Sequence, residues 1–363
     1  MHTFYHVGHI KHDPEALHKP DTPQKNKIYS DTASRGLTLY EAMNKANLGQ
    51  VTSPGDFGTE PIDILHDYGM RNLLHDGFDR VQTEFQASFA LPEIFALGKK
   101  PPRKPRSLQG QLGYYAFDIA SPLFEHTWEA AYWSVQTALS AAALVSVGNE
   151  QYAYGLCRPP GHHVGTAFFG GGCYLNNAAI TANWLLQQGR RVAILDIDYH
   201  HGNGTQDIFY HRSDVMVCSL HADPLYEYPY YWGYADENGI DHGRSYNYNY
   251  PLPRGTAEKH YLDVLAESLK KIRLYVPDIL VLSLGFDTLD GDPTGSHKLE
   301  PSSFLHIGKM IQDLSIPVAI IQEGGSLISA LGESVTHFFK GLLPETNSPG
   351  ETTNDNPKFL YEK

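Results

Sequence analysis

The sequence predicts an α/β protein, a single doubly wound domain in which helices flank a central, mostly parallel sheet. Short apolar runs alternate with helical stretches over the second half of the chain, and this alternation is typical of parallel sheets. The runs are almost continuously apolar, as expected for strands covered on both faces. A length of 363 residues with 41% hydrophobic residues suits one large domain with a substantial core.

Local patterns predict the individual elements along the chain. We expect strands at residues 3–7, 152–157, 191–197, 215–220, 279–284 and 318–322. We expect helices at residues 37–46, 68–81, 127–147, 176–188, 304–314 and 327–342. Thr127 stands where a helix cap is needed, Glu129 falls in the first turn of that helix, and Gly189 ends a later one.

Neither internal repeats nor an interdomain linker interrupt this pattern. We therefore expect one domain over residues 1–345, followed by a polar C-terminal tail at residues 346–363. Residues 99–106, with the sequence KKPPRKPR, are expected to form a solvated surface loop.

Composition limits the partners and the compartment. The formal net charge of −13 argues against a nucleic-acid partner held by phosphate contacts, and it serves solubility or the steering of a cationic substrate. We expect no membrane association, because the N-terminus has no apolar run and no segment is long enough to span a bilayer. Three cysteines without a CxxC pair predict reduced, buried thiols in a cytoplasmic protein.

Polar clusters follow the ends of five expected strands. Ligands of open α/β sheets bind beyond the carboxyl ends of the strands, so side chains at five such ends are expected to form the rim of one active site. The clusters occupy residues 158–165, 196–204, 221–223, 287–292 and 323–326.

Acidic and imidazole side chains in two of these clusters predict a metal site. Asp196 and Asp198 leave an apolar strand on the same side, where carboxylates are costly to bury without a cation. Asp198 and His200 suit a divalent metal of the zinc type, and Asp287 offers a third ligand from another strand end. Three protein ligands leave a position open for water and substrate.

Adjacent histidines stand on a proline-containing turn, at His162 and His163. Tandem histidines alone are usually ordinary polar loop residues. Beside a metal site, one of them could accept a proton from water while the other stabilises charge or donates to the leaving group.

Six motifs carry a family resemblance: RPPGHH, GGGCYLNN, LDIDYHHGNGTQDIFY, SLHADP, SLGFDT with GDP, and QEGG. Together they resemble the histone deacetylase and acetylpolyamine deacetylase superfamily, with the arginase–deacetylase fold, and most closely the bacterial acetylpolyamine amidohydrolases. The resemblance extends from the HVGHIKHDP segment to about Leu343. It implies a zinc-dependent hydrolase of N-acyl amides.

The resemblance implies roles for the residues at the matching positions. Zinc would be held by Asp198, His200 and Asp287, with His163 as general base and His162 as its electrostatic partner. The residues that hold these histidines would be Asp196 and Asn203.

The same resemblance implies structural potassium and a substrate tunnel. The first potassium site would use Asp196, Asp198, His200, Ser219 and Leu220, and the second Phe209, Arg212, Val215 and Tyr246. Tyr228 would form an aromatic wall of the tunnel, and Gly161 and Gly325 would let the backbone approach the site.

Two positions depart from the family pattern. Ser326 stands where relatives have a tyrosine that donates to the developing oxyanion, and loss of such a donor typically costs about 10²–10³ in rate. A water held by Ser326 could replace the phenol, a tyrosine could enter from another loop, or the protein could prefer activated acyl groups or only bind. Gly172 replaces an aromatic tunnel wall, which predicts tolerance of bulkier substrates.

The leading hypothesis is hydrolysis of an acyl, and foremost an acetyl, group from a small cationic amine such as an acetylated polyamine. Deacetylation of protein lysine is the nearest alternative, and a non-catalytic acyl-amide binding protein is another. A ureohydrolase of the arginase type fits less well, because the sequence lacks an aspartate two residues after His200. Relatives acting on polyamines are often homodimers, for which residues 99–106 and 110–118 offer candidate surfaces.

Overall fold

The computed structural model describes residues 1–14, 30–96 and 103–343. The predicted tail at residues 346–363 and residues 99–102 of the basic loop lie outside these ranges. Within them, no helix is both long enough and apolar enough to cross a membrane.

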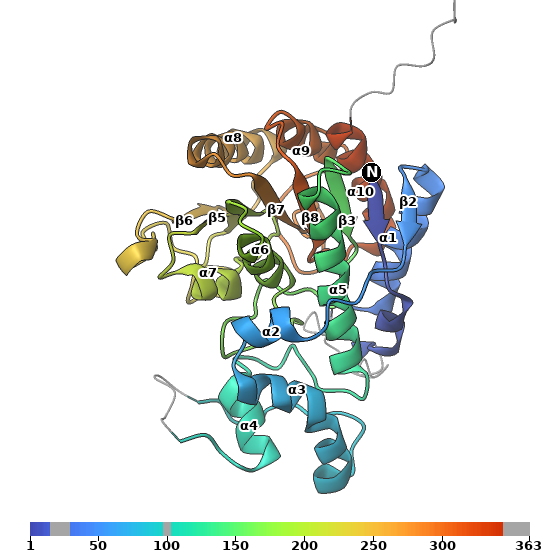
Figure 1. Ribbon diagram of the computed structural model, residues 1–363, viewed down its shortest axis with the longest axis vertical. Helices are drawn as coiled ribbons and strands as arrows, with labels where there is room; N and C mark the ends of the chain where they lie inside the picture. The colour runs from blue at the N-terminus through green and yellow to red at the C-terminus, as the bar shows by residue number, and fades with distance from the viewer. Residues whose placement is uncertain (15–29, 97–102, 344–363) are drawn as a thin grey trace, which may run out of the picture.

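The fold is built around one sheet of eight parallel strands, which confirms the predicted class (Figure 1). The strand order is β2-β1-β3-β8-β7-β4-β5-β6. The strands are β1 His2–Phe4, β2 Gln50–Thr52, β3 Tyr152–Gly155, β4 Val192–Asp196, β5 Val215–Ala222, β6 Asn247–Leu252, β7 Ile279–Leu284 and β8 Val318–Gln322. Because all neighbours run parallel, the carboxyl ends of β3, β8, β7, β4 and β5 lie along one edge.

Helices cover both faces of the sheet, and each face has its own apolar core (Figure 1). Along β4, Val192 and Ile194 pack into one core, whereas Ala193 and Leu195 pack into the other. The helices are α1 Ala33–Ala46, α2 Glu60–Leu65, α3 Tyr68–Arg80, α4 Leu108–Tyr115, α5 Thr127–Ser146, α6 Asn177–Gln187, α7 Asn203–Phe209, α8 Glu258–Tyr275, α9 Ser303–Gln312 and α10 Ile328–Leu342. This two-sided burial explains why the central strands are almost entirely apolar.

The N-terminal strand differs from its prediction. The strand expected at residues 3–7 ends at Phe4, and a 3-10 helix occupies Val7–Lys11. The His6 ring accepts a hydrogen bond from the backbone of Gly8 at 3.2 Å, which turns the chain away from the sheet.

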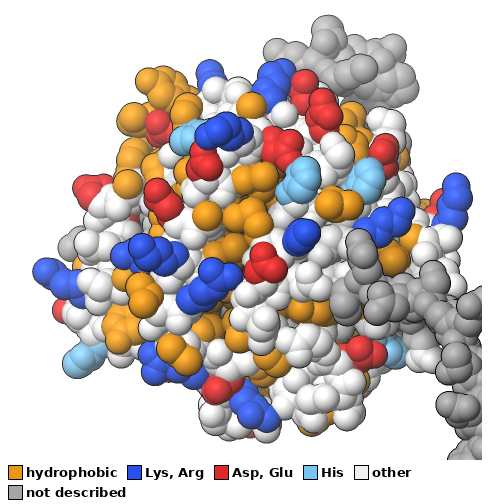
Figure 2. Space-filling view, turned by 90° about the horizontal axis from the view of Figure 1, so that it is seen from above, with side chains coloured by type: hydrophobic (Ala, Val, Ile, Leu, Met, Phe, Trp, Pro, Cys, Tyr) orange, Lys and Arg blue, Asp and Glu red, His pale blue; other side chains and the backbone are white. Residues whose placement is uncertain are grey.

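Side chains of both charges, with apolar groups between them, are spread over the face seen in Figure 2.

The stretch 110–118 is one of the two candidate dimer surfaces that the sequence offers. Within it, residues 112–116 are buried. The exposed or half-exposed part of that stretch is therefore limited to its two ends.

Candidate metal centre and active site

One cavity of about 720 Å³ opens at the edge where the central strands end. It collects residues from the loops that follow β3, β4, β5, β6, β7 and β8, from the loop after α4 and from the segment that precedes α1. The sequence-predicted residues among its lining are His162, His163, Gly172, Asp198, His200, Tyr228, Asp287, Gly325 and Ser326. Four of the five clusters that the sequence placed at strand ends thus meet in one space, whereas the cluster at residues 221–223 does not line it.

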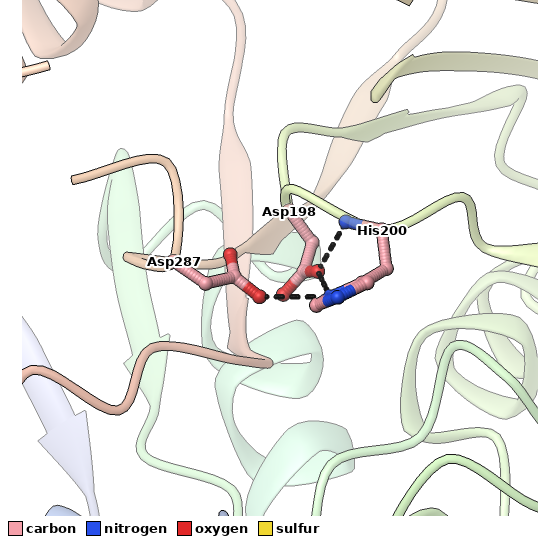
Figure 3. Close-up of side chains that lie close together, drawn as sticks. All are labelled: Asp198, His200 and Asp287. Carbon is pink, nitrogen blue, oxygen red and sulfur yellow. Dashed lines mark hydrogen bonds and ion pairs between the residues drawn. The ribbon is translucent and has the colours of Figure 1, made fainter. Parts of the chain in front are cut away.

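Asp198, His200 and Asp287 point toward one another at the base of this space (Figure 3). One ligand atom from each lies within 4.8 Å of the other two. The Nδ1 atom of His200 is 3.3 Å from Asp198 Oδ1 and 3.0 Å from Asp287 Oδ2. Backbone groups fix the carboxylates, since Gly324 N donates to Asp198 Oδ2 at 2.7 Å and Tyr199 N to Asp287 Oδ1 at 2.9 Å.

The charge of this triad fits a divalent cation. Asp198 and Asp287 are 1% and 2% exposed, so both carboxylates lie close together away from water. Burial and the neighbouring charge of Asp198 raise the pKa of Asp287 to about 7. A cation between the two would relieve this repulsion, and two carboxylates with one imidazole form a donor set suited to zinc.

The tandem histidines stand directly beside the triad. The ring centroids of His162 and His163 are 4.0 Å apart, and His163 lies 6.1 Å from the ring of His200. His162 Nδ1 is 2.9 Å from Asp196 Oδ2, and His163 Nδ1 is 2.7 Å from Asn203 Oδ1. Both rings are therefore oriented by the residues that the family resemblance implied for that purpose.

The two histidines differ in the environment that sets their charge. Burial lowers the pKa of His163, and the positive charges of His162 and His200 lower it further. Burial also opposes protonation of His162, but the carboxylates of Asp196 and Asp198 outweigh it and raise that pKa. The shifts thus favour a neutral His163 and a charged His162, a difference that suits a base and an electrostatic partner.

Tyr228 forms one wall of the cavity. Its ring lies 5.1 Å from the ring of His163 and 5.8 Å from that of His200. The hydroxyl donates to Asp118 Oδ2 at 2.6 Å, and Gly171 N donates to the same carboxylate at 3.0 Å. Asp118, which the sequence did not single out, therefore holds this wall in place from the loop after α4.

Ser326 and Gly172 border the same short segment. Ser326 Oγ is 3.5 Å from the carbonyl oxygen of Ser30. Among the described residues, a Cβ at Gly172 would meet only Asp31 Cβ within 4 Å, at 3.7 Å. The two positions at which the family resemblance implies a ring thus face one stretch of the cavity wall. At Gly325 the φ of +114° and the proximity of Phe286 Cβ, 2.7 Å from an added Cβ, favour glycine.

Arg35 is a second residue that sequence reasoning missed. Its guanidinium donates to the carbonyl oxygens of Gly325 at 2.5 Å and Glu323 at 2.6 Å, and it pairs with Asp31. It lies in α1, far from every motif, and an arginine in an amphipathic helix gives no sign that it will be buried. It clamps the loop that follows β8.

The candidate potassium ligands gather at two places around β5. Asp196 is opposite Ser219 in the β4–β5 register, and Ser219 Oγ already shares a hydrogen bond with His221 Nδ1 at 2.8 Å. The second set surrounds the turn between α7 and β5. There the carbonyl of Phe209 accepts from Arg212 N, that of Tyr246 accepts from Val217 N, and Val215 begins β5.

Comparison with known proteins identifies relatives of this site and fold. Residues 31–342 match the histone deacetylase domain family. Acetylpolyamine amidohydrolase 1 of Pseudomonas aeruginosa is 44% identical over 312 residues, covering 85% of this chain and 90% of that protein. Acetylpolyamine amidohydrolase of Burkholderia pseudomallei is 39% identical over 348 residues, covering 94% and 98%.

Solved structures agree with these matches. The crystal structure of acetylpolyamine aminohydrolase from Burkholderia pseudomallei superposes with a TM-score of 0.86 at 38% identity, covering 94% of this chain and 98% of that one. The HDA15 HD domain shares the fold, with a TM-score of 0.76 at 24% identity. On the family match, the high-coverage relatives and the shared fold, the chain belongs to the histone deacetylase domain family, alongside the bacterial acetylpolyamine amidohydrolases.

Proposed function

We propose that the protein is a zinc-dependent amidohydrolase that removes an acyl group, foremost acetyl, from a primary amine such as an acetylated polyamine. The observation that carries this proposal is the convergence of Asp198, His200 and Asp287 beside a pair of histidines with opposite pKa shifts. Bacterial relatives named acetylpolyamine amidohydrolase, up to 44% identical, support this substrate class.

The side chains around the cavity suggest how the reaction is divided. Zinc held by the triad would polarise the scissile carbonyl and lower the pKa of the attacking water. His163 accepts the proton of that water, because its imidazole is kept neutral and is oriented by Asn203. His162, kept charged by Asp196, stabilises negative charge as it develops on the substrate. The proton that His163 took from the water passes to the amine nitrogen as the C–N bond breaks, which releases a carboxylate and a cationic amine.

The position of Ser326 bears on the acyl preference. Its hydroxyl is 3.5 Å from the Ser30 carbonyl and brings no phenol into the cavity. Among the described residues, three tyrosines line the cavity, and two of them have committed hydroxyls, because Tyr174 donates to Pro122 O and Tyr228 to Asp118, whereas Tyr230 is half exposed. We therefore propose that plain acetamides react slowly and that amides with an activated acyl group react faster.

The open wall beside Gly172 bears on the bulk of the substrate. Because a Cβ there would meet, among the described residues, only Asp31 within 4 Å, the cavity wall is open at this position. We propose that substrates broader than a straight acetylated diamine are accepted.

The experiment is a comparison of turnover by zinc-loaded protein on N-acetylputrescine, an acetyl-lysine peptide and a trifluoroacetylated lysine amide. We expect zinc-dependent turnover of all three, fastest on the trifluoroacetyl substrate, with the acetylated diamine preferred over the acetyl peptide. The reverse order of the two acetyl substrates would favour the protein deacetylase. Tight binding of a hydroxamate without turnover of any substrate would identify an acyl-amide binding protein instead.

We also propose that one or two structural potassium ions bind around β5, and that the protein is a homodimer. Thermal midpoints in potassium against tetramethylammonium buffers test the first, and light scattering tests the second. A monomer at micromolar concentration would contradict the dimer.

A further inference from the structure

Glu323 is a buried carboxylate at the end of β8 that the reaction described above does not use. It is 0% exposed, and a buried carboxylate is costly unless donors surround it. Its partners therefore indicate what the residue does.

Two of these donors belong to the turn that carries the tandem histidines. Glu323 Oε2 accepts from the backbone N–H of Gly161 at 2.7 Å and from that of His162 at 3.2 Å. Glu323 Oε1 accepts from the hydroxyl of Ser283, at the end of β7, at 3.1 Å. One carboxylate thus ties the turn after β3 to the ends of β7 and β8.

The opposite side of the turn is closed by backbone. A Cβ at Gly161 would lie 2.4 Å from the nitrogen of Asn177 and 2.7 Å from the carbonyl oxygen of Leu175. The turn therefore packs against residues 175–177 on one side and is bonded to Glu323 on the other. Arg35 in turn holds the carbonyl oxygen of Glu323 at 2.6 Å.

We infer that Glu323 is a positioning residue. By holding the backbone of the turn, it fixes the distance of the His162 and His163 rings from the metal triad. This inference rests on the proposed function for its kinetic part, since it concerns the same reaction. For this role, the side chain at position 323 must carry a hydrogen-bond acceptor and be as long as glutamate, because both donors of the turn are backbone N–H groups. A displacement of a catalytic group by about 1 Å can cost about 10²-fold in rate.

The experiment compares Glu323→Ala, Glu323→Gln and Glu323→Asp with the wild type in kcat, KM, zinc content and amide hydrogen exchange. Glu323→Ala should lower kcat about 10–100-fold, leave KM within about twofold, retain zinc, and speed exchange at the amides of Gly161 and His162. Glu323→Gln, which keeps an acceptor of the same length, should restore most of kcat and the protection. Glu323→Asp, which keeps the charge but is one methylene shorter, should resemble Ala and carries the test if Ala does not fold.

The matched control is Tyr154→Phe, which removes the bond from Tyr154 Oη to Gln322 Oε1 (2.6 Å) without touching the turn. It should leave kcat and the exchange of the turn amides unchanged. The inference is overturned if Glu323→Ala and Glu323→Asp keep wild-type kcat and exchange, if zinc is lost with kcat, or if Gln loses as much as Ala. If the wild type is inactive, the proposed function fails, whereas the exchange pattern still decides whether Glu323 holds the turn.

Discussion

His162 and His163 are neighbours with ring centroids 4.0 Å apart, yet their pKa values are shifted in opposite directions. The difference comes from what faces each ring. Two carboxylates face His162, whereas His163 is bonded to the neutral side-chain amide of Asn203 and lies beside the ring of His162. Adjacent residues of the same type therefore have different tasks, and substitutions should separate them.

Replacing His163 by alanine should lower kcat by about 10²–10⁴, the range typical of losing a general base. Zinc content should stay at the wild-type level, since His163 is not among the triad. The measurement is kcat and bound metal side by side, with the exposed His260 replaced by alanine as the control. Wild-type turnover by His163→Ala would assign the base elsewhere.

Replacing Asp287 by asparagine should separate metal binding from the cost of buried charge. Loss of a charged ligand should weaken zinc binding by about 100-fold or more, since even outer partners of metal sites contribute 10–100-fold. In metal-free protein at pH 8, the same change should raise the thermal midpoint, because the raised pKa of Asp287 reports destabilising burial of its carboxylate. Zinc titration and thermal unfolding check both parts. An unchanged zinc affinity would disprove the metal centre.

Introducing a phenol at Ser326 should increase the rate on plain acetamides. Ser326→Tyr places a phenol at the position where the family resemblance implies an oxyanion donor, so kcat on an acetylated diamine should rise by about 10²–10³. The rate on a trifluoroacetylated substrate should change much less, because its carbonyl is already activated. The ratio of the two rates is the measurement.

Ser326→Phe is the control that separates the hydroxyl from the ring. It fills the same space without a donor, so it should leave the acetamide rate low. Both aromatic variants should reduce turnover of bulky substrates to the same extent, since they narrow the space beside Gly172. If phenylalanine stimulates the acetamide rate as well as tyrosine does, packing rather than oxyanion stabilisation is the cause.

His66 should make the folded state sensitive to acid. Its Nδ1 lies 3.0 Å from Gly165 O, its Nε2 accepts from Asn176 N at 3.1 Å, and burial lowers its pKa to about 4. Below pH 6.5 the unfolded chain binds a proton there that the folded chain does not. The free energy of unfolding should therefore fall between pH 6.5 and 4, by up to about 1.4 kcal/mol per pH unit for this group.

His66→Gln keeps a donor and an acceptor but does not titrate. Its free energy of unfolding is measured by denaturant titration from pH 7 to pH 4.5. The slope of this free energy against pH should be smaller than that of the wild type by up to about 1.4 kcal/mol per pH unit, which corresponds to one proton. His260→Gln, at an exposed site, is the matched control. Equal slopes for wild type and His66→Gln would show that His66 is protonated in the folded state.

The central strands were predictable because burial on both faces makes them continuously apolar. The edge strands were not, since β2 (QVT) and β6 (NYNYPL) are partly exposed and carry polar residues that read as loop. The helix α8 was also missed, because its apolar residues form only a stripe among many charges. Each of these elements is stabilised by a neighbouring element that buries one of its faces, and its own sequence does not show that contact.

The site residues within motifs were predictable, whereas those that support them were not. The side chains of Asp198, His200 and Asp287 meet as expected. Each follows the carboxyl end of a strand, and β4 and β7 are parallel neighbours, so their carboxyl ends lie side by side. Arg35 and Asp118 act through contacts with segments far away in sequence, and Glu323 was noted as part of a cluster without a role. Such partners depend on how loops fold back, which spacing along one chain does not encode.

The order of the strands along the chain determines when the metal ligands become available during synthesis. Asp198 and His200 leave the ribosome with β4, but Asp287 follows β7, and the Gly324 amide that binds Asp198 follows β8. A nascent or truncated chain that stops before β7 carries only two of the three metal ligands. Tight zinc uptake should accordingly begin only after translation has passed β8, so that metal loading reports completion of the polypeptide.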